Sequence, residues 1–144
     1  MLEERVKILF VDDESLVLGA LRRTLKNVRW SLFFCDNPEQ ALKIVEAEQI
    51  DVVVSDHAMP GLTGVDLLAV LRRTQEHVVR MMMTGHADRE LALRAINEGH
   101  VYRFIEKPWS DAALRMALHD AAHLALRRRQ EESERRSSLT GRSS

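Results

Sequence analysis

The chain contains an apolar run at 52–56, Val-Val-Val-Ser-Asp, which ends abruptly in the acid Asp56. Branched residues that fall on both faces of a pleat predict a strand buried on both sides, as in a parallel sheet beneath two helix layers. A turn should follow, because Pro60 cannot continue a strand and Gly61 tolerates positive φ. Asp56 is therefore expected at the carboxyl end of a central strand, where open parallel sheets bind their ligands.

Short apolar runs alternate with helical patterns along most of the chain. Asn37, Thr63 and Asp88 stand where they can cap helices, and Gly99 stands where a helix can end. Strand and helix alternate five times, which predicts an α/β fold with one five-stranded parallel sheet and helices on both faces. The expected strands are 6–11, 31–35, 52–56, 78–83 and 101–105.

The last helix, which should begin at Ser110, changes character midway. Its apolar stripe runs from Leu114 to Leu126, and no apolar residue follows until Leu139. Four oppositely charged pairs spaced four residues apart still favour a helix at 127–136, each by roughly 0.2–0.5 kcal/mol. Because this segment has no apolar face, the core of the domain cannot hold it. We expect a folded domain at 1–126, a projecting helical extension at 127–136 and a disordered tail at 137–144.

Composition narrows the class of protein. With 144 residues the chain has room for one domain, and its net charge of −1 gives no global field that would recruit nucleic acid or a membrane. No apolar run approaches the roughly 20 residues of a membrane span, and the N-terminus is no signal peptide, so we expect a cytoplasmic protein. The single cysteine, Cys35, and the run Met81-Met82-Met83 are most simply core residues.

Polar residues end four of the five expected strands. The first ends in Asp12 and Asp13, the third in Asp56, the fourth in Thr84 and the fifth in Lys107. A parallel sheet brings these ends to one edge, where two carboxylates about 4 Å apart would repel by about 4 kcal/mol at an effective dielectric near 20. A Mg²⁺ ion, which prefers oxygen ligands, would relieve that repulsion. Since an ammonium and a hydroxyl can donate to phosphoryl oxygens, the site suits attack of a carboxylate on phosphorus.

In this order, the five residues resemble the receiver domains of two-component response regulators, over about Lys7 to Leu126. The resemblance implies a CheY-like, flavodoxin-like three-layer fold with strand order 2-1-3-4-5 and, here, an extended C-terminal helix. It implies a phosphorylation-dependent switch and no enzyme beyond self-phosphorylation from small donors and self-dephosphorylation. The implied partners are a sensor histidine kinase and an output domain or downstream protein, with a homodimer through the fourth helix, fifth strand and fifth helix as an option.

The resemblance also implies a role for each site residue. Asp56 would accept the phosphoryl group, and Lys107 would be its cation. Asp13 and Asp56 would bind Mg²⁺ directly, together with the backbone carbonyl of Ala58, and Asp12 would act through water. No effector domain follows in this sequence, so we expect either a stand-alone regulator or the receiver of a longer protein.

Two further residues would transmit the response. Thr84 would move its hydroxyl toward the phosphoryl group, and Phe104 falls on the family's aromatic switch position, although it can also be read as a core residue. The Lys107–Pro108 bond resembles the family's cis peptide. The stretch 102–109 resembles receivers attached to cyclic-di-GMP phosphodiesterase domains of the HD-GYP type or to sensor kinases.

Three other classes of function fit parts of the same sequence pattern. A haloacid-dehalogenase-type phosphatase uses similar groups with Mg²⁺, but its nucleophile lies in an Asp-x-Asp motif, a spacing that Asp12-Asp13-Glu14 lacks. A flavodoxin-like cofactor binder would need a glycine-rich phosphate loop, and the sequence contains none of the known patterns. A phosphate-independent pseudo-receiver is disfavoured because every chemical residue is present.

Two patterns fall outside this constellation. His119 and His123 stand four apart on a helix and could form a metal pair, but no third ligand is evident nearby, which favours plain exposed positions. The run Arg127-Arg128-Arg129 could contact nucleic acid, but the acids that follow it favour a solvated helix face.

Overall fold

The computed structural model describes residues 5–59, 61–98 and 100–141. Five parallel strands form one sheet in the order β2-β1-β3-β4-β5, which confirms the predicted topology. The strands are β1 (Lys7–Val11), β2 (Ser31–Cys35), β3 (Val52–Asp56), β4 (Val79–Gly85) and β5 (Arg103–Lys107).

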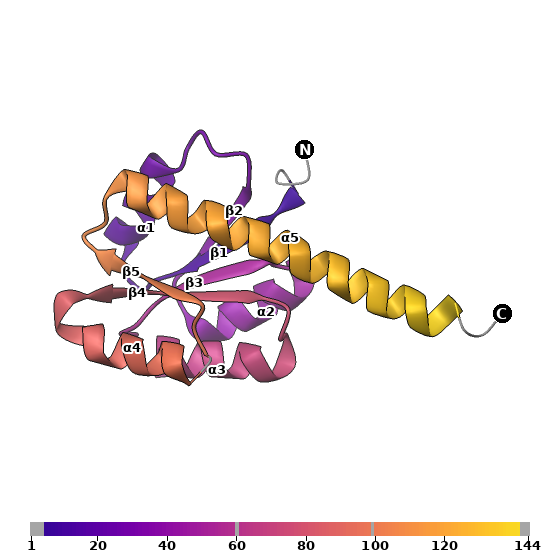
Figure 1. Cartoon of the computed structure of the whole chain (residues 1–144). Coiled ribbons are helices and arrows are strands. Elements are labelled where there is room, and N and C mark those ends of the chain that lie inside the picture. Colours follow the sequence, from indigo (N-terminus) through magenta and orange to yellow (C-terminus); the bar gives the residue numbers. More distant parts are fainter. Residues whose placement is uncertain (1–4, 60, 99, 142–144) are drawn as a thin grey trace.

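Helices cover both faces of the sheet, which makes the fold a three-layer sandwich. In Figure 1, α1 and α5 lie above the sheet, while α2, α3 and α4 lie below it. No helix in the described part of the chain is both long and apolar enough to cross a membrane. The helices are α1 (Ser15–Thr24), α2 (Pro38–Glu48), α3 (Gly64–Thr74), α4 (Arg89–Asn97) and α5 (Asp111–Gly141), with the short 3₁₀ helix η2 (His86–Asp88) before α4.

The central strand β3 is buried along its whole length. Val52 and Val54 pack into the core beneath α1 and α5, and Val53 packs into the core on the opposite face. The methionines at 81–83 are fully buried and alternate between the same two cores. Cys35 is a buried core residue as well, and burial raises the pKa of its thiol to about 11.

The helix starts agree in part with the sequence pattern. Asn37 and Thr63 cap α2 and α3 through their side-chain oxygens, as predicted. Asp88 stands at the N-cap of α4, but its side chain makes no capping hydrogen bond there. The predicted turn residue Pro60 and the predicted helix stop Gly99 lie outside the described residues.

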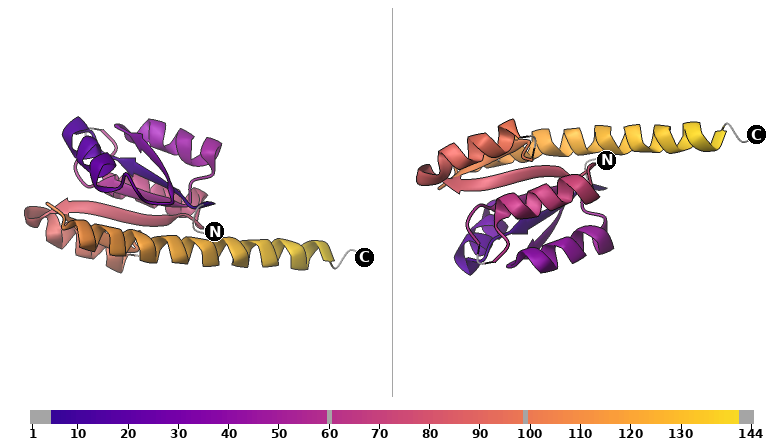
Figure 2. Two further views of the ribbon diagram at one scale, coloured as in Figure 1. Left: turned by 90° about the horizontal axis from the view of Figure 1, so that it is seen from above. Right: turned by 90° about the horizontal axis from the view of Figure 1, so that it is seen from below.

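The long helix α5 leaves the domain and projects beyond the sheet (Figures 1 and 2). It includes the extension at 127–136, where the exposed ion pair between Glu132 and Arg136 measures 3.0 Å. Residues 137–141 continue the same helix, which corrects the predicted disordered tail, and 142–144 lie outside the described residues. Intrahelical hydrogen bonds and charge pairs can extend a helix without any apolar face.

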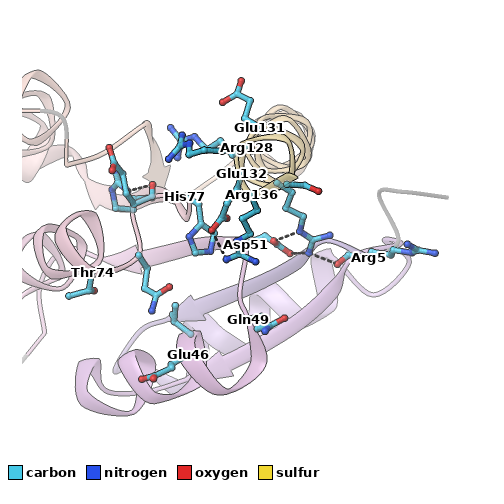
Figure 3. A pocket seen from close by; sticks show the side chains of 17 residues that line it. Arg5, Glu46, Gln49, Asp51, Thr74, His77, Arg128, Glu131, Glu132 and Arg136 are labelled. Atoms are coloured by element: carbon cyan, nitrogen blue, oxygen red, sulfur yellow. Dashed lines mark hydrogen bonds and ion pairs between the residues drawn. The ribbon is translucent and has the colours of Figure 1, made fainter. Parts of the chain in front are cut away.

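The first turn of this extension is not free of the domain, contrary to the expectation drawn from its lack of apolar residues. Asp51, which is 4% exposed, accepts a 2.8 Å hydrogen bond from the Lys7 backbone N–H and a 2.6 Å bond from Arg129 Nε. Arg129 Nη2 also contacts Asp51 Oδ2, and it donates to the backbone carbonyl of Arg5 at 3.0 Å. We call this set of contacts the α5 anchor; Figure 3 labels two of its members, Asp51 and Arg5.

The loop from β3 into α3 brings two backbones into close contact at Gly64. A Cβ atom on Gly64 would lie 2.0 Å from the carbonyl oxygen of Asp56 and 3.0 Å from its carbonyl carbon. The Gly64 N–H also donates to the carbonyl of His57 at 3.1 Å. Only glycine therefore allows α3 to begin directly against the end of β3.

Substitution of Gly64 tests this contact. We expect Gly64→Ala to destabilise the domain by about 3 kcal/mol or more, because the start of α3 must move away from the Asp56 carbonyl. Gly19→Ala in α1 is a matched control: its added Cβ would come no closer than 3.5 Å to Arg23, and alanine favours a helix by up to about 1 kcal/mol. Urea unfolding measures the stability of both variants, and equal stabilities of Gly64→Ala and Gly19→Ala would contradict the described packing.

A second substitution tests the α5 anchor. Arg129→Ala should lower the free energy of unfolding by about 1–3 kcal/mol. Of the two donors named above for the buried Asp51 carboxylate, the substitution removes Arg129 and leaves the Lys7 N–H. Arg136→Ala removes an exposed ion pair from the same helix and should cost no more than about 0.5 kcal/mol. If urea unfolding finds the two variants equally stable, the anchor contributes nothing to the fold.

Candidate phosphoacceptor site

The carboxyl ends of the strands bring the predicted site residues to one edge of the sheet. Asp12 and Asp13 follow β1, while Asp56 ends β3. Carboxylate oxygens of these three residues and of Glu14 all lie within 4.8 Å of one another. Glu14 was not among the predicted site residues, although its position directly after Asp13 could have indicated it.

Lys107 connects the two buried acids of this cluster. Its ammonium nitrogen lies 2.8 Å from Asp12 Oδ2 and 2.9 Å from Asp56 Oδ1. Burial by itself would lower the pKa of Lys107, but the hydrogen bonds and negative charges of both carboxylates outweigh it, and the pKa is raised. Lys107 therefore stays charged at neutral pH, which is the form that can donate to an oxyanion.

Asp56 has a raised pKa, from an ordinary value of 3.8. Burial is the largest cause, the negative charge of Asp12 adds to it, and the hydrogen bond from Lys107 opposes it. An acid with a raised pKa stabilises the fold below its ordinary value, and this contribution is lost as the pH rises through the folded-state pKa. At neutral pH the Asp56 carboxylate thus costs stability, and additional positive charge beside it would offset that cost.

The acidic cluster fits a hard divalent cation. Asp12 is fully buried and Asp56 is 6% exposed, while Asp13 is exposed, so the cluster opens to solvent on one side. Several carboxylate oxygens within a few ångströms of one another match the oxygen ligands that Mg²⁺ prefers. Ala58 lies in the loop directly after β3, and the role of its carbonyl remains a prediction.

Thr84 and Phe104 lie on the same side of the sheet. Met82 pairs with Phe104 and Thr84 pairs with Glu106, so in two parallel neighbouring strands the two residues are diagonal neighbours on one face. Thr84 is 1% exposed, and its hydroxyl donates to the carbonyl of Gly85 at 3.2 Å. The partly buried ring of Phe104 packs against the core on the α4 side of the sheet.

The structure adds contacts at two residues close to Asp56. The backbone of Gly64 touches that of Asp56, and a single glycine in the sequence does not reveal such a contact. His57 follows Asp56, and its Nε2 lies 3.9 Å from a carboxylate oxygen of Asp88, which joins the end of β3 to the segment before α4. The Lys107–Pro108 peptide bond is cis, in agreement with the resemblance.

Relatives with curated names were found at moderate identity. Hydrogenase transcriptional regulatory protein HoxA of Cupriavidus necator is 33% identical over 109 residues, or 76% of this chain and 22% of HoxA. Chemotaxis protein CheY-3 of Vibrio cholerae is 36% identical over 125 residues, or 82% of this chain and 92% of CheY-3. The chain thus spans nearly all of CheY-3 but less than a quarter of HoxA.

Solved structures agree with these relatives. The signal receiver domain of an HD domain-containing protein from Pseudomonas fluorescens Pf-5 superposes with a TM-score of 0.82 at 33% identity, covering 88% of this chain and 93% of that domain. The family model of the response regulator receiver domain matches residues 8–119. Since this match covers most of the sequence and includes the ends of all five strands, the chain belongs to the response regulator receiver domain family.

Proposed function

We propose that this receiver accepts a phosphoryl group on Asp56 from a phosphohistidine of a sensor kinase. The observation that supports the proposal is the Lys107 ammonium, placed 2.9 Å from Asp56 Oδ1 and 2.8 Å from Asp12 Oδ2. An Asp56 oxygen attacks phosphorus, the bond between phosphorus and the donor nitrogen breaks, and that nitrogen keeps the electron pair. The product is an aspartyl phosphate whose oxygens accept hydrogen bonds from Lys107.

Asp13, Asp56 and the Ala58 carbonyl would bind Mg²⁺, with Asp12 acting through water. When bound, the ion supplies positive charge that offsets the carboxylates and the transferred phosphoryl oxygens. Asp12 has a second task, because its carboxylate accepts a hydrogen bond from the same Lys107 ammonium that donates to Asp56 and so helps to position it. The Asp12 Oδ1 oxygen accepts the Glu14 N–H at 2.9 Å, which orients that carboxylate.

The phosphoryl group would act on the rest of the domain through Thr84 and Phe104. The Thr84 hydroxyl would exchange its Gly85 partner for a phosphoryl oxygen, and the ring of Phe104 would take up the space that Thr84 leaves. This exchange would alter the face formed by α4, β5 and α5. The phosphoryl group can shift the populations of the two conformations of this face only by as much as it binds one conformation more favourably than the other.

The output is proposed from the relatives. HoxA is named as a transcriptional regulator, and the Pseudomonas fluorescens receiver belongs to an HD domain-containing protein. We propose that the α4-β5-α5 face controls an attached output domain or a separate partner, with α5 as the connector and a homodimer through this face as a further state. The phosphatase and flavodoxin-like alternatives have no support once the family is known, and the phosphate-independent pseudo-receiver becomes an outcome of the next experiment.

Phosphorylation of Asp56 should be visible by intact mass. Treatment with acetyl phosphate and Mg²⁺ should add one phosphoryl group to the wild-type chain and none to Asp56→Asn, because the amide cannot attack phosphorus. Removal of Mg²⁺ with EDTA should suppress the addition, because charge compensation in the cluster is then lost.

Asp36→Asn is the matched control, since Asp36 is an exposed acid at the end of the edge strand β2 and should leave labelling unchanged. Wild-type protein that takes up no phosphoryl group under these conditions would identify a pseudo-receiver. Equal labelling of Asp56→Asn and wild type would move the acceptor elsewhere.

Coupling through Thr84 should be separable from phosphorylation itself. Thr84→Ala should still take up the phosphoryl group, but NMR shift changes on the α4-β5-α5 face should become smaller, because the hydroxyl that follows the phosphoryl group is gone. Ser55→Ala is the control: Ser55 lies on β3, which neighbours the strand of Thr84, and its buried hydroxyl donates to the backbone carbonyl of Asp56 at 3.0 Å. A wild-type response in Thr84→Ala would contradict the coupling.

A further inference from the structure

The histidine pair on α5 has a geometry that its spacing alone does not reveal. His119 and His123 are both exposed, and their Nε2 atoms lie 3.1 Å apart. The ring centroids are 4.5 Å apart, and the ring planes make an angle of 72°. The two imidazoles therefore approach each other through the nitrogens that most often bind metals.

These distances can be compared with those of two imidazoles bound to one metal ion. With metal–nitrogen bonds of about 2.05 Å, Nε2 atoms 3.1 Å apart subtend an angle of about 98° at the metal, between the square-planar and tetrahedral values. The same arrangement places the ring centroids about 4.8 Å apart. The observed 4.5 Å differs from this by a few tenths of an ångström.

A simple hydrogen bond between the rings fits the same distances less well. A linear N–H···N bond of 3.1 Å, with both rings aligned along it, would separate the centroids by about 5.4 Å. The observed separation of 4.5 Å is shorter, so the ring axes are bent away from the line that joins the two nitrogens. A bend of this kind is compatible with both nitrogens binding one ion, for which the two ring axes must converge.

We propose that His119 and His123 bind a transition-metal ion. Cu²⁺ should bind most tightly, and Ni²⁺ and Zn²⁺ should bind more weakly. Imidazole nitrogens suit these ions, and the usual order of affinity for nitrogen ligands rises from Ni²⁺ to Cu²⁺ and falls at Zn²⁺. Because the residues stand one turn apart on a single helix, the second nitrogen binds at high effective concentration once the first has bound. Because both histidines are exposed, water can supply further ligands.

This site is separate from the acidic cluster at the sheet edge in both place and chemistry. The cluster offers carboxylate oxygens, which suit Mg²⁺, while the α5 pair offers nitrogen donors. Asp120, which lies between the histidines in sequence, is paired with Arg103 of β5 at 3.0 Å. A metal on this pair would therefore lie on α5 next to the contact that joins α5 to β5.

Calorimetric titration of the untagged full chain, cleared of metals and kept in millimolar Mg²⁺, tests the proposal. We expect one Cu²⁺ per chain, with Ni²⁺ and Zn²⁺ binding more weakly at the same place. His119→Ala and His123→Ala should each lower the affinity on the order of 100-fold, because the chelate is lost. Both residues are exposed on a helix, so the variants should keep the fold, which circular dichroism checks.

His77→Ala provides the matched control, since His77 lies in the turn after α3, and it should bind as the wild type does. Line broadening by Cu²⁺ should be strongest at the imidazole resonances of His119 and His123, which a merely structural role would not produce. Wild-type affinity in both single variants would overturn the proposal and leave the pair as a hydrogen bond. An equal loss in His77→Ala would overturn it in favour of unspecific binding to histidines.

Discussion

The Lys107 ammonium between two buried carboxylates is the interaction on which the site depends. Asp12 is fully buried and Asp56 nearly so, and buried charges of one sign are tolerated only when a partner of the opposite sign is close. Lys107 supplies that partner from β5, two strands away from Asp56 in the sheet order. The charge that keeps the strand ends together is thus the same one that, in the proposed function, would stabilise the phosphoryl group.

The central strand β3 has an acid at each end, and both acids are bound by cations from later in the chain. Asp51 precedes the strand and binds Arg129, while Asp56 ends it and is paired with Lys107. The strand between them is entirely apolar apart from Ser55 and is fully buried. Because α5 is anchored to one end of the strand that bears the site at the other, its direction is tied to the same rigid element. This arrangement suits a connector that reports the state of the site.

Much of the fold could be predicted from local patterns. The apolar runs at 6–11 and 52–56 specify strands, and the strand-helix alternation specifies a parallel sheet whose carboxyl ends share an edge. That rule alone is sufficient to bring Asp12, Asp56 and Lys107 to one edge of the sheet. It worked because a parallel sheet converts position along the chain into position at an edge, independently of how the side chains pack.

The sequence by itself determined the approximate positions of the strands and the chemical groups at the sheet edge, and the family resemblance supplied the order of the strands. Only the tertiary structure decided how close backbones approach and which distant charges pair. The contact of Gly64 with the Asp56 carbonyl and the pairing of Arg129 with Asp51, 78 positions apart, depend on the packing of whole elements. The helix at 137–141 likewise corrects the expectation that the residues near the end of the chain are disordered. Periodicity reports which face of an element is buried; it contains no information on the side chain that meets it across the core.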